Sequence, residues 1–296
     1  FRKINMYSDY LKKLFFAENK HLTIFAVINF LLLYSSVFIP GYEYFIDEPY
    51  YIACADNPAF GYVDHPPLAP VILMFYKFIF GESLYSIRFL AALMSSVTVF
   101  LAGIVTKQLG GNRPAQSLAS LCIILTPIFA IFGSYYSMNV FEPLLCLVSI
   151  YFFIKMIKEE NPKYWFHIGI IFGLLIINKH TAGLFILSFI SSLLLTKNRR
   201  FLFTKNFLFC VLFTSIIFIP NLIWQIQNGF PSVEFYANNI IHKNVPIPPI
   251  EYIILQIIAY NPFVFVISVA GTAFLFVNKD LKAFKVLGVA FILIFL

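Results

Sequence analysis

Charged residues are scarce in this sequence: they form 12% of its 296 residues, whereas 60% of the residues are hydrophobic. A soluble domain carries about 25% charged residues. The chain also contains 37 phenylalanines and 17 tyrosines, more large apolar side chains than a soluble core of this length could bury. These proportions exclude an ordinary water-soluble protein, and we expect lipid to surround much of the surface.

Cysteines are few as well, and their spacing fits no metal site. Only Cys54 lies in a segment that we expect outside the membrane, so no disulfide is expected. The sequence also lacks an internal repeat, a low-complexity tract and any stretch polar enough to form a soluble domain. A single membrane domain over residues 1–296 is therefore predicted. Because the last apolar run stops in mid-helix at Leu296, we expect this domain to be truncated at its C-terminal end.

The apolar runs are long and continuous, which indicates helices, because a helix satisfies its own backbone hydrogen bonds inside a bilayer. The predicted fold class is all-α: a polytopic transmembrane helical bundle. The expected spans cover residues 21–39, 84–106, 115–132, 138–156, 164–178, 181–196, 206–223, 251–277 and 284–296. The fifth and sixth of these are short and are separated only by Lys179 and His180, which indicates a tight hairpin.

The basic residues predict the orientation, because loops on the cytoplasmic side carry an excess of lysine and arginine. With the N-terminus in the cytoplasm, the 21 basic residues fall in cytoplasmic segments apart from Lys77, Arg88, Lys179 and Lys243. Most of the acids fall on the outer side. We therefore predict an integral membrane protein with its N-terminus in the cytoplasm and a polar mouth outside. For a net charge of +7 we expect membrane lipids, not nucleic acid, as partners.

Two outer segments, residues 40–83 and 224–250, are longer than turns. The first contains an apolar stretch over residues 68–80, a length typical of an interfacial or re-entrant helix and too short for a span. The second is rich in asparagine, proline and aromatic residues, and we expect a partly irregular loop over the outer mouth.

Acidic residues in the first outer segment are the first candidates for chemistry. Asp47 and Glu48 precede Pro49, so they fit either the cap of a surface helix or carboxylates that accept a proton or hold a metal in an external cavity. Asp64 and His65 stand before a double proline and fit either a polar loop cap or half of a metal site, although their spacing is far from that of a zinc site.

Further polar residues lie at the outer ends of apolar runs. Glu142 lies at membrane depth, where a carboxylate usually faces a polar cavity, although a helix cap is the alternative. Lys179 and Arg88 are cations on the acid-rich side, where each pairs with a phosphate or a neighbouring acid, or extends to the interface. Trp224 and Gln225 combine an aromatic ring with an amide, which fits either an interfacial anchor or a sugar-binding surface.

Together these residues resemble the integral-membrane glycosyltransferases of the GT-C type, in particular the bacterial branch related to dolichyl-phosphate-mannose protein mannosyltransferases and to the lipid A aminoarabinose transferase. The resemblance covers about residues 40–262, and its motifs follow the family order. The matching segments are Asp47-Glu48-Pro49-Tyr50-Tyr51, Gly61-Tyr62-Val63-Asp64-His65-Pro66-Pro67, residues 81–89, Asn139-Val140-Phe141-Glu142-Pro143, residues 178–181 and residues 223–230.

The resemblance implies transfer of a sugar from a polyprenyl-phosphate donor to a lipid, glycan or protein acceptor on the outer, periplasmic face of a bacterial inner membrane. Asp47 matches the acid of the first external loop, the base or acceptor-orienting group of that family, and Glu142 matches the acid after the third span. Some relatives carry lysine where this chain has His65. The expected catalytic residues are Asp47, Glu48 and Glu142; the expected phosphate ligands are Lys179, Arg88, His65 and Lys243; the expected sugar or acceptor contacts are Tyr50, Tyr51, Trp224, Gln225 and His242.

Alternatives stay open for the mechanism and for the function. A carboxylate is a weak base for a hydroxyl, so we expect either late, coupled proton loss to Asp47 or a divalent metal held by Asp47, Asp64 and Glu142. Inversion at the sugar carbon is the simpler expectation, because no second nucleophile is needed. The rival function is a membrane transporter or lipid flippase, which would place charges near the bilayer midplane and show repeated halves with broken spans.

Overall fold

The computed structural model describes residues 18–41, 43–242 and 246–295, and over these residues the protein is all-α, with no β-strand. This confirms the predicted helical membrane bundle. The α-helices are α2 (Lys20–Tyr34), α3 (Glu48–Asp56), α4 (Leu68–Phe80), α5 (Leu84–Gln108), α6 (Arg113–Leu125), α7 (Pro127–Ser134), α8 (Phe141–Lys158), α9 (Trp165–Asn178), α10 (Ala182–Leu194), α11 (Lys205–Gln227), α12 (Pro231–His242), α13 (Pro249–Tyr260), α14 (Pro262–Val277) and α15 (Lys285–Phe295).

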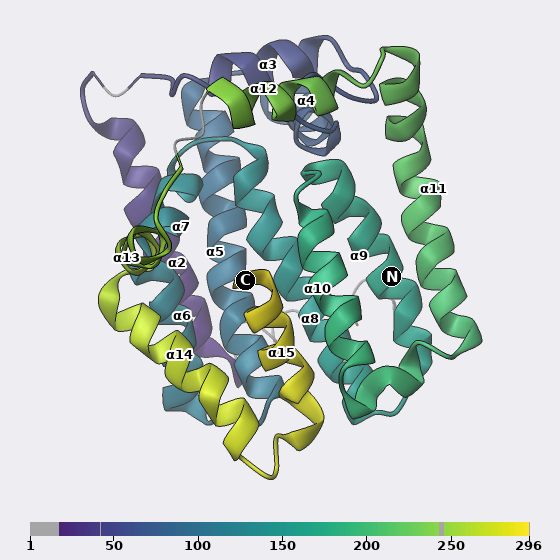
Figure 1. Cartoon of the computed structure of the whole chain (residues 1–296). Coiled ribbons are helices and arrows are strands. Elements are labelled where there is room, and N and C mark those ends of the chain that lie inside the picture. The colour runs from purple at the N-terminus through teal and green to yellow at the C-terminus, as the bar shows by residue number, and fades with distance from the viewer. Residues whose placement is uncertain (1–17, 42, 243–245, 296) are drawn as a thin grey trace, which may run out of the picture.

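The long helix α5 is the centre of one half of the bundle, where it packs against α2, α6 and α8 (Figure 1). In the other half α9 packs along α11, and α10 packs against α15. The approach of α9 to α11 is close at Gly169, where an added Cβ would lie 2.6 Å from the backbone of Cys210. Small residues at such crossings allow helix backbones to pack directly in a membrane protein.

Four helical segments of the described chain are long and apolar enough to cross a membrane: Lys20–Phe38, Leu84–Gln108, Met138–Lys158 and Lys205–Gln227. Two expected spans, residues 115–132 and 251–277, are bent pairs instead, with α6–α7 bent by 66° and α13–α14 by 104°.

Both bends lie directly before a proline. Thr126 precedes Pro127 and takes φ −84° and ψ 112°, and Asn261 precedes Pro262 with φ 73°. Proline disfavours the α conformation in the residue before it, which ends the first helix of each pair. The apolar pattern runs through both breaks, and for this reason each pair looked continuous in the sequence.

Three other expected spans are short helices. α9 has 14 residues, α10 has 13 and the described part of α15 has 11. At about 1.5 Å per residue, 14 residues reach only about 21 Å, less than a hydrocarbon core of about 30 Å. α9 and α10 meet at Lys179 and His180, so the predicted tight hairpin brings these two polar residues to the end of both helices.

Helices α3, α4 and α12 lie across one end of the bundle, which we call the outer end (Figure 1). The first outer segment forms two short helices, α3 and α4, and the expected apolar helix over residues 68–80 is α4. The second outer segment is more regular than expected, because α11 continues to Gln227 and most of the following residues form α12. The outer end collects nearly all of the candidate site residues.

Candidate active site

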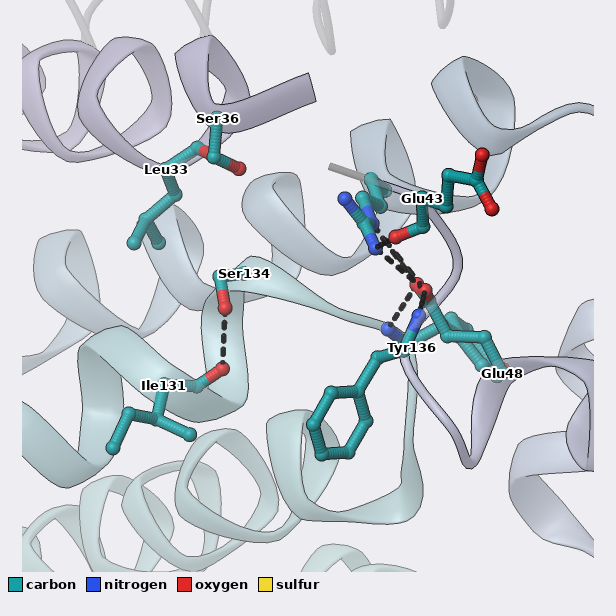
Figure 2. Close-up of polar contacts among 9 residues, drawn as sticks. Leu33, Ser36, Glu43, Glu48, Ile131, Ser134 and Tyr136 are labelled. Carbon is teal, nitrogen blue, oxygen red and sulfur yellow. Dashed lines mark hydrogen bonds and ion pairs between the residues drawn. The ribbon is translucent and has the colours of Figure 1, made fainter. Parts of the chain in front are cut away.

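Glu48 is a fully buried carboxylate at the start of α3, and it is the centre of a dense set of hydrogen bonds. The backbone N–H groups of Phe45 and Tyr136 donate to its oxygens at 2.8 Å and 3.0 Å, and Arg88 Nη2 lies 2.9 Å from Oε2. Figure 2 shows the Glu48 carboxylate facing Tyr136, with Glu43 close by. Glu48 therefore ties together the residues before α3, helix α5 and the turn that follows α7.

Arg88, on α5, is the cation in this set of hydrogen bonds around Glu48. Its side chain is 2% exposed, it donates from Nε and Nη2 to Glu48, and Nη2 also donates to the Glu43 carbonyl oxygen at 2.6 Å. The guanidinium is thus buried and engaged with Glu48 and with the Glu43 carbonyl oxygen. The geometry gives Glu48 and Arg88 the task of positioning the start of α3, which differs from the expected roles of catalytic neighbour and phosphate ligand.

Asp47 stands directly before Glu48 but has the opposite environment. Its side chain is exposed and accepts no capping hydrogen bond from α3. Among the described residues its carboxylate has no hydrogen-bond or ion-pair partner, and its negative charge acts on the nearby Tyr51 and His65. The anchored Glu48 thus fixes the backbone at the start of α3, and on the same backbone the neighbouring Asp47 stays exposed.

Asp64 and His65 lie on the turn that leads into α4, residues 60–67, which we call the α4 turn. Tyr50 Oη donates a 2.6 Å hydrogen bond to Asp64 Oδ1 and so joins this turn to α3. His65 is 1% exposed, and its ring stacks on Tyr51 with the centroids 4.8 Å apart. Both residues are therefore partners of the two α3 tyrosines.

The protonation state of His65 follows from its neighbours. Nδ1 lies 2.9 Å from the carbonyl oxygen of Pro66, and because a carbonyl only accepts, the proton is on Nδ1. Nε2 keeps a lone pair and has no hydrogen-bond partner within the described residues, since Asp64 Oδ1 is 4.0 Å away. Burial lowers the pKa of His65 below its ordinary value of 6.5, so the ring is neutral at pH 7. In this state His65 offers an acceptor and lacks the charge expected of a phosphate ligand.

The two expected sugar contacts on α3 differ in exposure. Tyr50 is 40% exposed, whereas Tyr51 is 4% exposed and its Oη accepts a hydrogen bond from the backbone N–H of Met138. Burial raises the pKa of both tyrosines above the ordinary value of 10.0, so both hydroxyls are neutral. Only Tyr50 reaches the surface in a way that fits contact with a sugar.

Glu142 and Lys179 form an ion pair between the start of α8 and the α9–α10 hairpin. Lys179 Nζ lies 3.1 Å from Glu142 Oε2 and donates to Asn139 Oδ1 at 3.0 Å, and the two charged side chains are 26% and 27% exposed. Asn178 Nδ2 donates to the Met138 carbonyl oxygen, which links the hairpin to the residue that also contacts α3. Glu142, expected as a catalytic residue, and Lys179, expected as a phosphate ligand, are thus in direct contact.

Trp224 and Gln225, at the end of α11, hold the α4 turn against α12. A Cβ added to Gly61 would collide with the Trp224 ring. Gln225 is 5% exposed and its Nε2 donates to Ser232 Oγ at 2.7 Å, and this hydroxyl donates in turn to the Tyr62 carbonyl oxygen at 3.2 Å.

The remaining expected sugar and phosphate contacts lie at the end of α12 and beyond it. His242 is the last residue of α12, where only its backbone is described, and Lys243 lies outside the described residues.

Some residues of the cluster were not anticipated from the sequence. His180 Nε2 lies 3.1 Å from Asn221 Oδ1, and Asn221 Nδ2 donates to the Phe60 carbonyl oxygen at 2.7 Å. The signal in the sequence was Asn221 itself, because an amide inside an apolar run needs polar partners when it is buried. In the structure Asn221 is 1% exposed. This pair connects the hairpin to the α4 turn.

The three acids expected to bind a metal are not gathered. Asp64 accepts from Tyr50, Glu142 pairs with Lys179, and no group of three or more His, Cys, Asp or Glu side chains in the described part of the chain is arranged to hold a metal ion. This donor set does not fit a metal, and no reaction step is assigned to one below.

An apolar groove with a volume of about 310 Å³ lies beside the cluster. It runs between the α4 turn, the start of α4, the end of α9 and α11. Its lining includes Phe60, Leu68, Val71, Ile177, Ile217 and Asn221. Asn221 belongs to both the groove and the polar network, so the groove reaches the hairpin that carries Lys179.

Comparison with known proteins decides the family. The model of the dolichyl-phosphate-mannose-protein mannosyltransferase family matches residues 64–224, which is more than half of the chain. The chain belongs to this family. It is therefore a membrane glycosyltransferase of the GT-C type, in a family whose sugar donor is linked to a polyprenyl phosphate. The match includes Asp64, Glu142 and Lys179 and begins after Asp47. No curated protein and no solved structure matches the chain.

Proposed function

We propose that the protein transfers a sugar from a polyprenyl-phosphate donor to an acceptor hydroxyl at the outer end of the bundle, with Asp47 as the acceptor's base. The observation that carries this proposal is the contrast between two adjacent acids. Glu48 is buried and fully hydrogen-bonded, whereas Asp47 is exposed and has no partner among the described residues. A general base has to reach the proton that it removes, and Asp47 meets that requirement.

Lys179 is the candidate ligand for the donor phosphate. An ammonium group has three N–H donors, and two of those of Lys179 go to Glu142 and Asn139. The third is available, and the side chain is 26% exposed. Glu142 then has the role of holding Lys179 in place, and a positive charge at this point stabilises the phosphate as it departs.

The apolar groove is the candidate seat of the isoprenoid chain. Its lining is almost entirely aliphatic and aromatic, and it touches Asn221, whose hydrogen bond to His180 leads to the neighbouring Lys179. A lipid tail in the groove would place its phosphate near the hairpin. This arrangement favours a lipid-linked donor over a soluble sugar nucleotide.

The reaction is written as a single displacement. The acceptor oxygen forms a bond to the anomeric carbon of the sugar, and the bond from that carbon to the phosphate oxygen breaks, with its electron pair leaving on the phosphate. The acceptor proton passes to Asp47 late in this step, because a carboxylate is too weak a base to remove it first. One displacement inverts the configuration at the anomeric carbon.

The proposed setting is a bacterial inner membrane with the N-terminus in the cytoplasm and the active site on the periplasmic face. Support comes from the distribution of charge: Lys107, Arg113, Lys158 and Arg199 lie near helix ends remote from α3 and α4, as expected of the cytoplasmic side. The acceptor belongs to one of three classes, a lipid, a glycan or a protein.

The test is a transfer assay with the purified protein in detergent and a radiolabelled polyprenyl-phosphate sugar. Asp47→Asn is expected to lower the transfer rate at least about 100-fold, in the range typical for loss of a general base. Glu43→Gln is the matched control, because Glu43 is an exposed acid of the same segment, and it should retain the wild-type rate. Full activity of Asp47→Asn would remove Asp47 from the mechanism, and solute uptake into liposomes without transfer would favour a transporter.

A further inference from the structure

A polar pocket lies at the end of the bundle remote from the candidate active site. It has a volume of about 380 Å³ and is lined by Glu18, His21, Lys107, Arg113 and Gln116. These residues come from the start of α2, the end of α5 and the start of α6, and α5 begins at the outer end. The pocket therefore belongs to no part of the proposed transfer reaction.

The wall of the pocket is fixed by hydrogen bonds between distant segments. His21 Nε2 lies 3.1 Å from Gln116 Oε1, and Gln116 Nε2 donates to the Gly111 carbonyl oxygen at 2.8 Å. Lys107 Nζ donates to Asn19 Oδ1 at 2.9 Å. The shape of the pocket is thus set by the fold before any ligand enters.

The charge of the pocket is positive. Lys107 and Arg113 outnumber the single acid, Glu18, which lies 3.7 Å from Lys107 Nζ. The Arg113 side chain is exposed and has no hydrogen-bond or ion-pair partner among the described residues. Arg113 also stands in the first turn of the 13-residue helix α6, whose positive dipole end adds to the attraction for an anion.

The surface next to the pocket is apolar. α2 and α6 pack side by side, and Ile24, Leu118 and Leu121 on these helices are 51%, 44% and 37% exposed. Each lies one to two turns from the pocket toward the middle of the bundle, where the membrane supplies hydrocarbon. A ligand with a phosphate at one end and alkyl chains at the other matches both surfaces together.

We propose that this pocket binds the phosphate group of an anionic glycerophospholipid whose acyl chains lie along α2 and α6. Arg113 contacts the phosphate directly, and Lys107 adds a second positive charge from α5. The apolar surface beside the pocket favours a lipid over free phosphate, which would use the charges alone. The lipid would lie on the surface of the bundle and contact both the start of α2 and the α5–α6 connection.

The test measures binding of phosphatidylglycerol and of phosphatidylcholine to the purified protein in neutral detergent, at about 0.15 M salt, by native mass spectrometry. Wild type is expected to prefer phosphatidylglycerol. Arg113→Gln should weaken phosphatidylglycerol binding about fivefold, the effect typical of one basic residue beside an anionic lipid. Arg199→Gln is the matched control, because Arg199 is an exposed arginine in another connection and does not line the pocket.

Two results would overturn the proposal. Equal weakening by Arg113→Gln and Arg199→Gln would show a general attraction of lipid to basic residues, and displacement of the lipid by millimolar inorganic phosphate would show a free-phosphate site. Because Arg113 is exposed, its substitution should leave thermal unfolding unchanged, which keeps the comparison with Arg199→Gln valid. No sugar donor is present, so the outcome does not depend on the transferase reaction.

Discussion

Two ion pairs at the outer end of the bundle differ in their exposure to solvent. Glu48 and Arg88 are 0% and 2% exposed, and every Glu48 oxygen is hydrogen-bonded. Lys179 and Glu142 are 26% and 27% exposed, and the lysine keeps an N–H group available. A buried pair whose carboxylate oxygens are all hydrogen-bonded holds segments in place, whereas a partly open pair can accept a ligand. The difference in burial distinguishes two ion pairs whose residues look alike in the sequence.

The largest expected effect is on the buried pair. Arg88→Met leaves the Glu48 carboxylate buried without its cation, which should lower the free energy of unfolding by about 3–5 kcal/mol. Thermal unfolding in detergent measures this change in stability. The double variant Glu48→Gln, Arg88→Met should lose less than Arg88→Met alone, because no unpaired charge remains. A loss below about 1 kcal/mol for the single variant would contradict the anchoring role.

The open pair should respond in the opposite way. Lys179→Gln removes the charge that we propose beside the departing phosphate, and the transfer rate should fall about 100-fold, as when an oxyanion ligand is lost. Unfolding should change by less than about 1 kcal/mol, because a partly exposed pair contributes little to stability. Lys179→Arg is the control and should retain part of the activity. An inactive and unfolded Lys179→Gln protein would place this pair in the structural class.

A third prediction concerns the α4 turn. Gly61→Ala forces a Cβ against the Trp224 ring and within 2.8 Å of Asn221 Nδ2, so unfolding should become easier by about 1–3 kcal/mol. Gly183→Ala is the matched control, because nothing lies within 4 Å of its added Cβ. Thermal unfolding compares the two variants. Equal stability would mean that Trp224 moves freely and does not hold the turn.

The smallest expected effect is the contribution of His65 to the pH dependence of the folded protein's stability. Its folded-state pKa lies below 6.5, so the unfolded chain binds more protons at mildly acidic pH, and stability falls as the pH drops through about 6.5. His65→Gln removes this contribution, which is about 1 kcal/mol or less between pH 7.5 and pH 5.5. Melting temperatures at both pH values should therefore differ less in the variant. The same acid sensitivity in both proteins would contradict a buried, neutral His65.

The sequence was sufficient to predict the fold class, the short apolar helix of the first outer segment and the grouping of polar residues at one end. Long apolar runs predict helices, and the 13-residue stretch that became α4 is too short for a span. The bends at Thr126 and Asn261 were not predicted, because a hydropathy pattern does not show the effect of a proline on the conformation of the residue before it.

The different burial of Asp47 and Glu48 also could not be predicted from the sequence. The two acids are adjacent, and their different burial depends on Tyr136 and Arg88, which are 88 and 40 residues from Glu48 in the chain. The same holds for Glu142 and Lys179, which are brought together only by the packing of α8 on α9. Partners at such distances follow from tertiary packing, which a single sequence does not display.

One pair of variants tests the division of labour between the adjacent acids most directly. The transfer rate and the melting temperature are measured for Asp47→Asn and for Glu48→Gln under the same conditions. We predict that Asp47→Asn keeps the wild-type melting temperature and loses transfer, whereas Glu48→Gln lowers the melting temperature because it removes the carboxylate charge that faces the buried Arg88. Wild-type transfer by a folded Asp47→Asn protein would contradict the assignment of Asp47 as the base.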